Sequence, residues 1–294
     1  MERDFGSIAV QGVSLSKRLT EQMEKGFAEN GLTPSDFRQS PHYLESLLHD
    51  CFDILNAALE QNKVSAAFIV LDATVNPDLA GAEASRAGIF LKNMAPNVAY
   101  ESPSAIRYMR GPTSIARARN MYLMPQWEME FSITRNDFFY QGMEAADNDG
   151  LELSRLYYWN PKSFLAGDYI EAMMLVIPMI AGDGTVIGVC GFEISGMLFK
   201  MQYTPDNATF SRIFSMLAPT GGEKTLDASQ ALFAGGYTAT SAGINGVLET
   251  ETKKNGLSYF IGPDDAVYSG LYRPVNLYPK DAIHGNTQWI LSIA

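Results

Sequence analysis

The chain has 294 residues, of which 46% are hydrophobic and 19% are charged, the composition of a folded globular protein with one large core or two ordinary ones. Its net charge of −11 repels the phosphate backbone of nucleic acids, which argues against a nucleic-acid partner. Every apolar run is shorter than the roughly 20 residues that span a bilayer, and the opening residues lack the apolar stretch of a signal peptide.

Residues 1–62 carry two helical patterns. Apolar residues from Ile8 to Phe27 recur at helical spacing and predict a long opening helix. Ser40-Pro41 is typical of a helix start, with a capping serine followed by a proline in the first turn. The apolar stripe from Tyr43 to Leu59 then predicts an amphipathic second helix. We therefore assign residues 1–62 to an N-terminal helical segment.

After residue 62 the patterns change to those of strands. Val64–Val75 is apolar and rich in β-branched residues, which predicts a buried strand, and Pro112–Met121 predicts a helix. Met173–Ala181 and Val186–Ser195 flank the turn-forming residues 182–185 and predict a hairpin. We assign residues 63–202 to a first α+β lobe.

The remainder of the chain is richer in strand patterns. Tyr203–Asn207 reads as a linker, and Ala242–Lys254 predicts a short helix. We assign residues 205–294 to a smaller, β-rich lobe. Its predicted strands are Thr209–Leu217, Ala231–Tyr237, Leu257–Ile261, Ala266–Tyr272 and Gln288–Ile293.

Residues typical of catalysis are scarce. The three histidines are His42, His49 and His284. The first two share a helix face near Cys51, but no third ligand is suitably spaced for a metal ion, and His284 has no serine or aspartate partner nearby in the sequence. We therefore expect no enzymatic activity, no metal and no cofactor. Cys51 and Cys190 are either buried thiols or a single disulfide.

Aromatic and polar residues crowd into segments 126–131, 135–140 and 155–161. Trp, Tyr and Arg side chains combine flat faces with fixed donors, which is the equipment of a small-molecule pocket, although aromatic clusters more often form core. Core is the favoured interpretation for Phe139. For Tyr158 and Trp159, pocket and core are equal alternatives.

Glu193 is a charged residue within the apolar run Val186–Ser195. Strand alternation places it on the face of Gly191 and Ser195, opposite Phe192 and Ile194. Its carboxylate either points to solvent or reaches a pocket and pairs with a cation. The small neighbours Gly191 and Ser195 leave room for a ligand on that face.

These segments together resemble the double Cache family of sensor domains. In that family the second hairpin strand commonly reads G-x-x-x-G-V-x-G-x-D-I-S, and Gly184–Ser195 follows this pattern with Glu193 in the aspartate position. The resemblance is specific across Arg135–Phe199 and elsewhere rests on the order of elements. It implies an α+β fold with a long N-terminal helix followed by two PAS-like lobes with antiparallel sheets.

The resemblance also implies a role. Such domains lie on the extracytoplasmic face of a bacterial membrane, between two transmembrane helices, and bind a small metabolite in the membrane-distal lobe, here residues 63–202. Residues 205–294 then form the membrane-proximal lobe, which relays the change to the membrane helices. The chain opens almost directly into a helix and stops on an apolar strand, which is typical of a receptor fragment whose flanking helices have been removed. The exposed opening helix is a candidate contact for a homodimer.

The family's ligand residues can be placed on this sequence by position. Phe139-Tyr140 matches its aromatic-Tyr pair, Tyr158-Trp159 matches the aromatic segment that faces it, and Glu193 matches the carboxylate that takes an ammonium group. Asp137 stands where the arginine is expected, although Arg135 is near, so we expect a cationic or neutral polar ligand. The predicted ligand-binding residues are Trp127, Arg135, Asp137, Phe139, Tyr140, Tyr158, Trp159 and Glu193.

Two other functions stay open. The first lobe could hold a vestigial pocket in a module that binds a partner protein, or the chain could be a soluble enzyme of unknown class. A thermal-shift screen against metabolites separates these alternatives from sensing, because a ligand that binds the folded state stabilises it.

Overall fold

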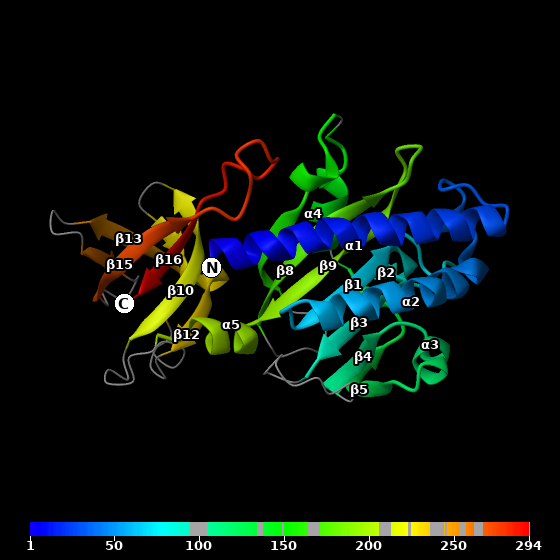
Figure 1. The fold of residues 1–294 in the computed structure, drawn as a ribbon, viewed down its shortest axis with the longest axis horizontal. Helices are drawn as coiled ribbons and strands as arrows, with labels where there is room; N and C mark the ends of the chain where they lie inside the picture. Colours follow the sequence, from blue (N-terminus) through cyan, green and yellow to red (C-terminus); the bar gives the residue numbers. More distant parts are fainter. Residues whose placement is uncertain are drawn as a thin grey trace.

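The computed structural model describes residues 1–94, 105–133, 138–148, 150–163, 171–205, 213–222, 225–235, 244, 246–252, 257–261 and 267–293. Two long helices and two seven-stranded sheets form its framework, so the predicted α+β class with a long N-terminal helix is confirmed. Figure 1 shows the two sheets at opposite ends of the longest axis, with the first helix running across the first sheet.

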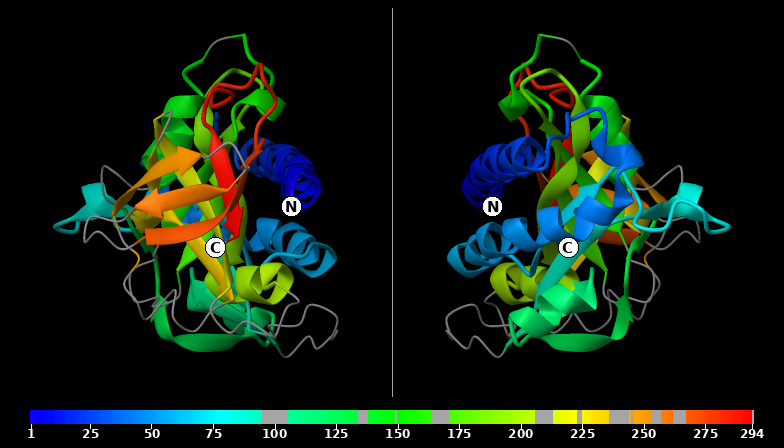
Figure 2. Two further views of the ribbon diagram at one scale, coloured as in Figure 1. Left: turned by 90° about the vertical axis from the view of Figure 1, so that its left-hand side faces the viewer. Right: turned by 90° about the vertical axis from the view of Figure 1, so that its right-hand side faces the viewer.

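The long helices are α1 (Glu2–Glu29) and α2 (Leu44–Gln61), and both bury one stripe of apolar residues. They contact each other, and α1 also packs on the central strands of the first sheet. The two views in Figure 2 place α1 and α2 on the same side of that sheet. Among the described helices, none is long and apolar enough to cross a membrane.

The first sheet has the strand order β5-β4-β3-β1-β9-β8-β7, and we call this sheet with its helices the first lobe. Neighbouring strands are antiparallel, as the sequence predicted, except β4 and β5, which are parallel. Its strands are β1 (Ala66–Leu71), β3 (Gly88–Asn93), β4 (Ile106–Arg110), β5 (Tyr122–Glu128), β7 (Tyr158–Ser163), β8 (Ala172–Ile180) and β9 (Val186–Ser195).

Shorter elements complete the first lobe. Helix α3 (Thr113–Ala118) lies within the predicted helix, and α4 (Phe138–Ala145) packs on β8 and β9. Strands β2 (Ser85–Arg86) and β6 (Phe131–Ser132) form a small separate pair. The predicted hairpin is confirmed as β8–β9, and Gly184 in its turn has φ +88°, a conformation that glycine adopts without strain.

Helix α5 (Gly196–Tyr203) follows the first sheet and packs on the second, which we call the second lobe. The order of the second sheet is β11-β13-β14-β15-β16-β10-β12. Strand β10 also pairs with β11, the strand at the far end of this order. All of its pairs are antiparallel. Its strands are β10 (Phe214–Gly222), β11 (Thr225–Asp227), β12 (Leu232–Gly235), β13 (Val247–Thr252), β14 (Ser258–Ile261), β15 (Val267–Val275) and β16 (Trp289–Ile293).

The predicted short helix at Ala242–Lys254 is wrong where the structure describes it, because residues 247–252 form β13. Leu248 is buried opposite Leu226 of β11, whereas its neighbour Val247 is exposed. This two-residue alternation suits a strand with one face on the core. Burial against β11 therefore decided the conformation of this segment over its local helical pattern.

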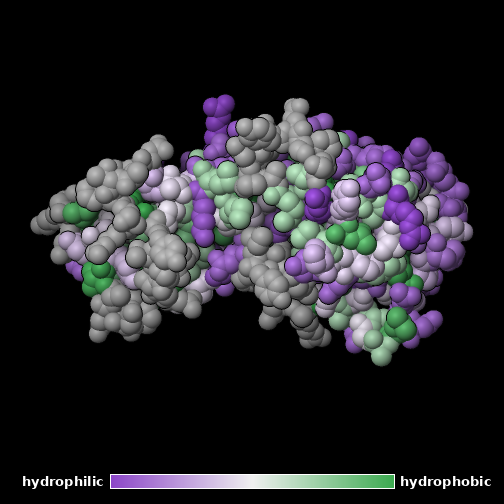
Figure 3. Space-filling model, turned by 90° about the horizontal axis from the view of Figure 1, so that it is seen from below, coloured by the Kyte–Doolittle hydropathy of each residue, from purple (hydrophilic) through white to green (hydrophobic). Residues whose placement is uncertain are grey.

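One large core cluster joins the long helices, one face of the first sheet and part of the second lobe. A second cluster lies between the other face of the first sheet and α4, and a third lies inside the second lobe. In the part of the surface that Figure 3 describes, strongly hydrophobic residues appear only as small separate patches among polar ones.

Candidate functional site

The two faces of the first sheet belong to different core clusters. In β1, Ile69 packs with residues of α1 and α2, whereas Phe68 packs with Phe138 of α4. Ala66, on the face of Phe68, is paired with Glu193 of β9. Directly paired residues project to the same face, so Glu193 lies on the α4 side of the sheet.

Glu193 is buried and forms an ion pair. Its side chain is 2% exposed, and Lys92 of β3 is 4% exposed with its Nζ 3.4 Å from Glu193 Oε1. The two residues reach each other across β1, which lies between their strands. Removing two charges from water costs several kcal/mol for each ion, so this contact is an expensive feature in the middle of a sheet.

Ser65 completes the polar cluster at this end of β1. Its hydroxyl lies 2.9 Å from Glu193 Oε1 and 2.8 Å from the carbonyl oxygen of the same residue. The backbone N–H of Ser195 donates to the Ser65 hydroxyl at 2.7 Å. The Ser195 hydroxyl in turn accepts from the N–H of Leu198 and caps α5. The cluster thus connects the centre of the first sheet to the helix that leads to the second lobe.

The sequence prediction for Glu193 is confirmed in its alternation, because Phe192 and Ile194 pack on the opposite face. The room expected beside Gly191 is not there. A Cβ at Gly191 would lie 1.8 Å from the Leu175 carbonyl oxygen and 3.1 Å from the Phe68 ring. The glycine allows β8 and β9 to approach closely, and leaves no ligand space at its own position.

Phe139 and Tyr140 also lie on the α4 side of the sheet. Phe139 is fully buried in the second core cluster, and Tyr140 is half-buried against that cluster. Their ring centroids are 5.4 Å apart, edge to face, and the Arg86 guanidinium lies 5.4 Å from the Phe139 ring centroid. Phe139 is therefore core, as its sequence indicated, whereas Tyr140 keeps part of its ring accessible.

Trp159 lies on the opposite face of the sheet from Glu193 and is core, one of the two alternatives that its sequence left open. It pairs with Leu175 on the α1 side of the sheet, where its ring centroid is 5.0 Å from that of Phe5. Tyr158 precedes it in β7, and its ring contacts His284 of the second lobe at 4.7 Å. Tyr158 and Trp159 thus join the first lobe to the second lobe and to α1.

Trp127 is also separated from this region. It lies in β5, at the opposite edge of the sheet from β7, and its Nε1 donates to the Gly111 carbonyl oxygen at 3.0 Å. Arg135 and Asp137 lie outside the described residues. The structure thus brings together Glu193, Phe139 and Tyr140 on one face, and separates Trp127, Tyr158 and Trp159 from them.

Sequence reasoning missed Lys92 and Arg110. Arg110 is buried, its Nη1 donates to the carbonyl oxygens of Met109 and Gln126, and its Nε lies 3.4 Å from Glu128 Oε2. Lys92 ends the apolar run of β3 and alternates with Phe90. That combination of a lone cation and an apolar strand could have identified it as a partner for Glu193.

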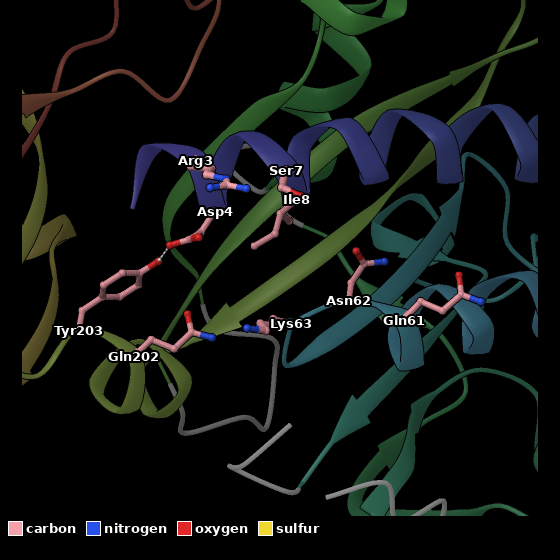
Figure 4. A pocket seen from close by; sticks show the side chains of 9 residues that line it. All are labelled: Arg3, Asp4, Ser7, Ile8, Gln61, Asn62, Lys63, Gln202 and Tyr203. Atoms are coloured by element: carbon pink, nitrogen blue, oxygen red, sulfur yellow. Dashed lines mark hydrogen bonds between the residues drawn. The ribbon is translucent and has the colours of Figure 1, made fainter. Parts of the chain in front are cut away.

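A cleft of about 500 Å³ lies where the start of α1, the end of α2 and the end of α5 meet. Figure 4 shows its side chains, among which the Tyr203 hydroxyl donates to Asp4 at 3.0 Å. The lining is mostly exposed and polar, with amides and charges but no histidine or cysteine. It is formed by Arg3, Asp4, Ser7, Ile8, Gln61, Asn62, Lys63, Gln202 and Tyr203.

Groups suited to metal binding or nucleophilic attack are not evident in the described chain. No group of three His, Cys, Asp or Glu residues could hold a metal ion there. Cys51 and Cys190 are buried free thiols, so of the two alternatives the structure shows thiols. Burial raises the pKa of Cys51 to about 12 and also raises the pKa of Cys190. Both are therefore protonated and poorly nucleophilic at neutral pH.

No known protein family and no curated protein matches this chain. Among solved structures it is similar to the periplasmic sensory domain of a Campylobacter jejuni chemoreceptor, with 13% identity, coverage of 99% and 88% of the two chains, and a TM-score of 0.49. It is also similar to a methyl-accepting chemotaxis protein, with 13% identity, 98% and 96% coverage and a TM-score of 0.43. The ligand-binding domain of a Pseudomonas aeruginosa amino-acid chemoreceptor, solved with GABA, has 11% identity, 96% and 95% coverage and a TM-score of 0.37. The chain is thus similar over almost its whole length, at low identity, to sensory domains of receptors.

Proposed function

We propose that this chain is the extracytoplasmic sensor domain of a bacterial signal-transduction receptor and is not an enzyme. A small polar metabolite binds on the α4 side of the first sheet, and the resulting change passes through α1 and the second lobe to membrane helices outside the chain. The two α+β lobes, the long first helix and the pattern of Gly184–Ser195 support this role. Such signalling requires only different affinities for two conformations.

The observation that carries the proposal is the buried pair of Lys92 and Glu193. Ionisable groups buried with a specific charge partner occur preferentially at functional sites. The pair lies on the α4 side of the first sheet, on its central strands at the end where β1 begins, and through Ser65 and Ser195 it connects to α5. A ligand that changes this pair therefore acts directly on the element between the lobes.

The pair also sharpens the ligand class. Asp137 and Glu193 alone favour a cationic or neutral ligand, but Lys92 supplies a positive charge 3.4 Å from Glu193. Lys92 and Glu193 carry opposite charges. The attraction between Glu193 and a lone ammonium group of a ligand is therefore opposed by the repulsion from Lys92. We propose a zwitterionic or neutral polar metabolite, with Lys92 facing its acceptors and Glu193 facing its donors.

A thermal-shift screen of amino acids, amines and dicarboxylates tests this function. At a concentration 100 times its Kd, a ligand of the folded state stabilises the chain by about 2.7 kcal/mol. We expect stabilisation by zwitterionic or neutral polar compounds, and its loss in the double variant Lys92→Met/Glu193→Met. The control is Lys25→Met/Glu29→Met, which removes an exposed Lys–Glu pair of α1.

Three results would contradict the proposal. Stabilisation by dicarboxylates alone would rule out the ligand class. Stabilisation that survives in the folded Lys92/Glu193 double variant would rule out this site. A complete absence of stabilisation by the library would rule out metabolite binding and favour a module that binds a partner protein.

A further inference from the structure

Residues 276–285, between β15 and β16, reach from the second lobe to the first, and we call this segment the strap. The Tyr157 hydroxyl donates to the Leu277 carbonyl oxygen at 2.9 Å, and the Trp159 N–H donates to the Tyr278 hydroxyl at 2.9 Å. The rings of Tyr157 and Tyr278 stack with centroids 5.5 Å apart. Figure 1 shows this segment extending away from the second sheet beside the start of α1.

Polar contacts hold both ends of the strap. The Asn276 N–H donates to Glu2 Oε1 of α1 at 2.7 Å. Towards the other end, Arg155 Nε donates to Asp281 Oδ2 at 2.7 Å. The backbone N–H of Ile283 also donates to the Arg155 carbonyl oxygen, at 3.1 Å. The strap therefore fastens the second lobe to α1 and to the chain that enters β7.

His284 lies in the strap between two tyrosines. Its ring centroid is 4.7 Å from that of Tyr158 and 5.7 Å from that of Tyr278. Its Nε2 is buried and has no hydrogen-bond partner among the described residues. Arg155 and Asp281, the charged groups of the strap contacts described above, pair with each other. A proton on the imidazole would therefore put charge on a half-buried ring whose buried Nε2 lacks an acceptor among the described residues.

We propose that the strap is an acid-sensitive joint between the two lobes, which is closed when His284 is neutral and loosened when His284 is protonated. The joint needs no ligand, so this inference goes beyond metabolite sensing and stands independently of it. Protonation would place charge within the contacts of His284 with Tyr158 and Tyr278, and the Tyr158 contact links the first lobe to the second.

The direction of the pH effect follows from burial. Desolvation lowers the pKa of His284 in the closed joint, whereas an exposed histidine has a pKa of about 6.5. The open state therefore binds a proton at a higher pH than the closed state does. The stability of the closed joint is fully present above about pH 6.5 and is lost as the pH falls through the pKa of the closed form.

An NMR titration of the imidazole groups tests the first part of this proposal. The chain has three histidines, so His42→Gln and His49→Gln variants assign all three signals. We expect the His284 signal to titrate below the pH of about 6.5 at which an exposed histidine titrates. A midpoint for His284 at or above about pH 6.5 would overturn the proposal.

Tryptophan fluorescence tests whether this proton opens the joint. Trp159 and Trp289 are buried in one core cluster with Tyr278, so Trp127→Phe leaves emission only from these two residues. We expect a shift to longer wavelength when this variant is taken from pH 7.5 to pH 5.0. The shift should be absent after His284→Gln, or after His284→Phe if the first substitution unfolds the chain, and retained after His49→Gln. Absence of the shift in the parent variant, or its persistence in a folded His284 variant, would overturn the proposal.

Discussion

For individual residues, the position in the fold settles roles that the sequence leaves open. Glu193 reads in the sequence as a charged residue in an apolar strand, and the structure gives it Lys92 and Ser65 as partners. The sequence leaves pocket and core as equal alternatives for Trp159. In the structure it is core, because it is buried on the α1 side of the sheet. At this scale, the contacts across strands determine what each side chain can do.

Lys92→Met should destabilise the chain by about 3–5 kcal/mol, because it removes the cation 3.4 Å from the buried Glu193 carboxylate. Urea unfolding measures this loss. The double variant Lys92→Met/Glu193→Met should recover much of the stability, since it removes both charges and keeps similar volumes. A single variant that is no less stable than the exposed control Lys25→Met would show that the pair is not energetically coupled.

At the scale of elements, helix α1 has one packed side and one exposed side. One side packs along the first sheet and α2, and the other side is open to solvent. Val10 is 67% exposed on this outer side, which otherwise carries polar residues such as Ser14 and Lys17. An exposed valine on a helix that contacts both lobes is a suitable contact for a second copy of the chain, the homodimer contact that the sequence predicts for this helix.

If α1 forms the dimer contact, Val10→Glu should weaken self-association at least tenfold, because the new carboxylate would face its own copy across a two-fold axis. Sedimentation velocity across a range of concentrations measures the dimer constant. Gln11→Glu adds the same charge to the neighbouring position and serves as the control. Equal dimerisation in both variants, or a parent chain that is monomeric throughout, would rule out this contact.

At the scale of the whole molecule, the two lobes share a core. Trp159 and Phe5 belong to the same large cluster as Leu217, Tyr278 and Trp289 of the second lobe. The strap adds polar contacts between the lobes at the same place. The molecule is therefore built so that a movement in the first lobe strains the second.

Because of this shared core, we expect the described chain to unfold as one cooperative unit at pH 7.5. Differential scanning calorimetry should give a single transition with a calorimetric enthalpy close to the van't Hoff enthalpy. At pH 5.0 the transition should broaden or divide, as protonation of His284 loosens the joint. Two resolved transitions at pH 7.5 would contradict the shared core as the dominant link between the lobes.

The sequence by itself determined the two long helices α1 and α2, the β8–β9 hairpin and the face of β9 on which Glu193 lies. These depend on local periodicity and turn residues, which are properties of neighbouring positions. Only the tertiary structure decided that residues 247–252 form a strand, that Lys92 is a partner of Glu193 and that Trp159 lies on the α1 side of the sheet. Each of these depends on which strands become neighbours and which face a helix covers, and residues far apart in the sequence decide both.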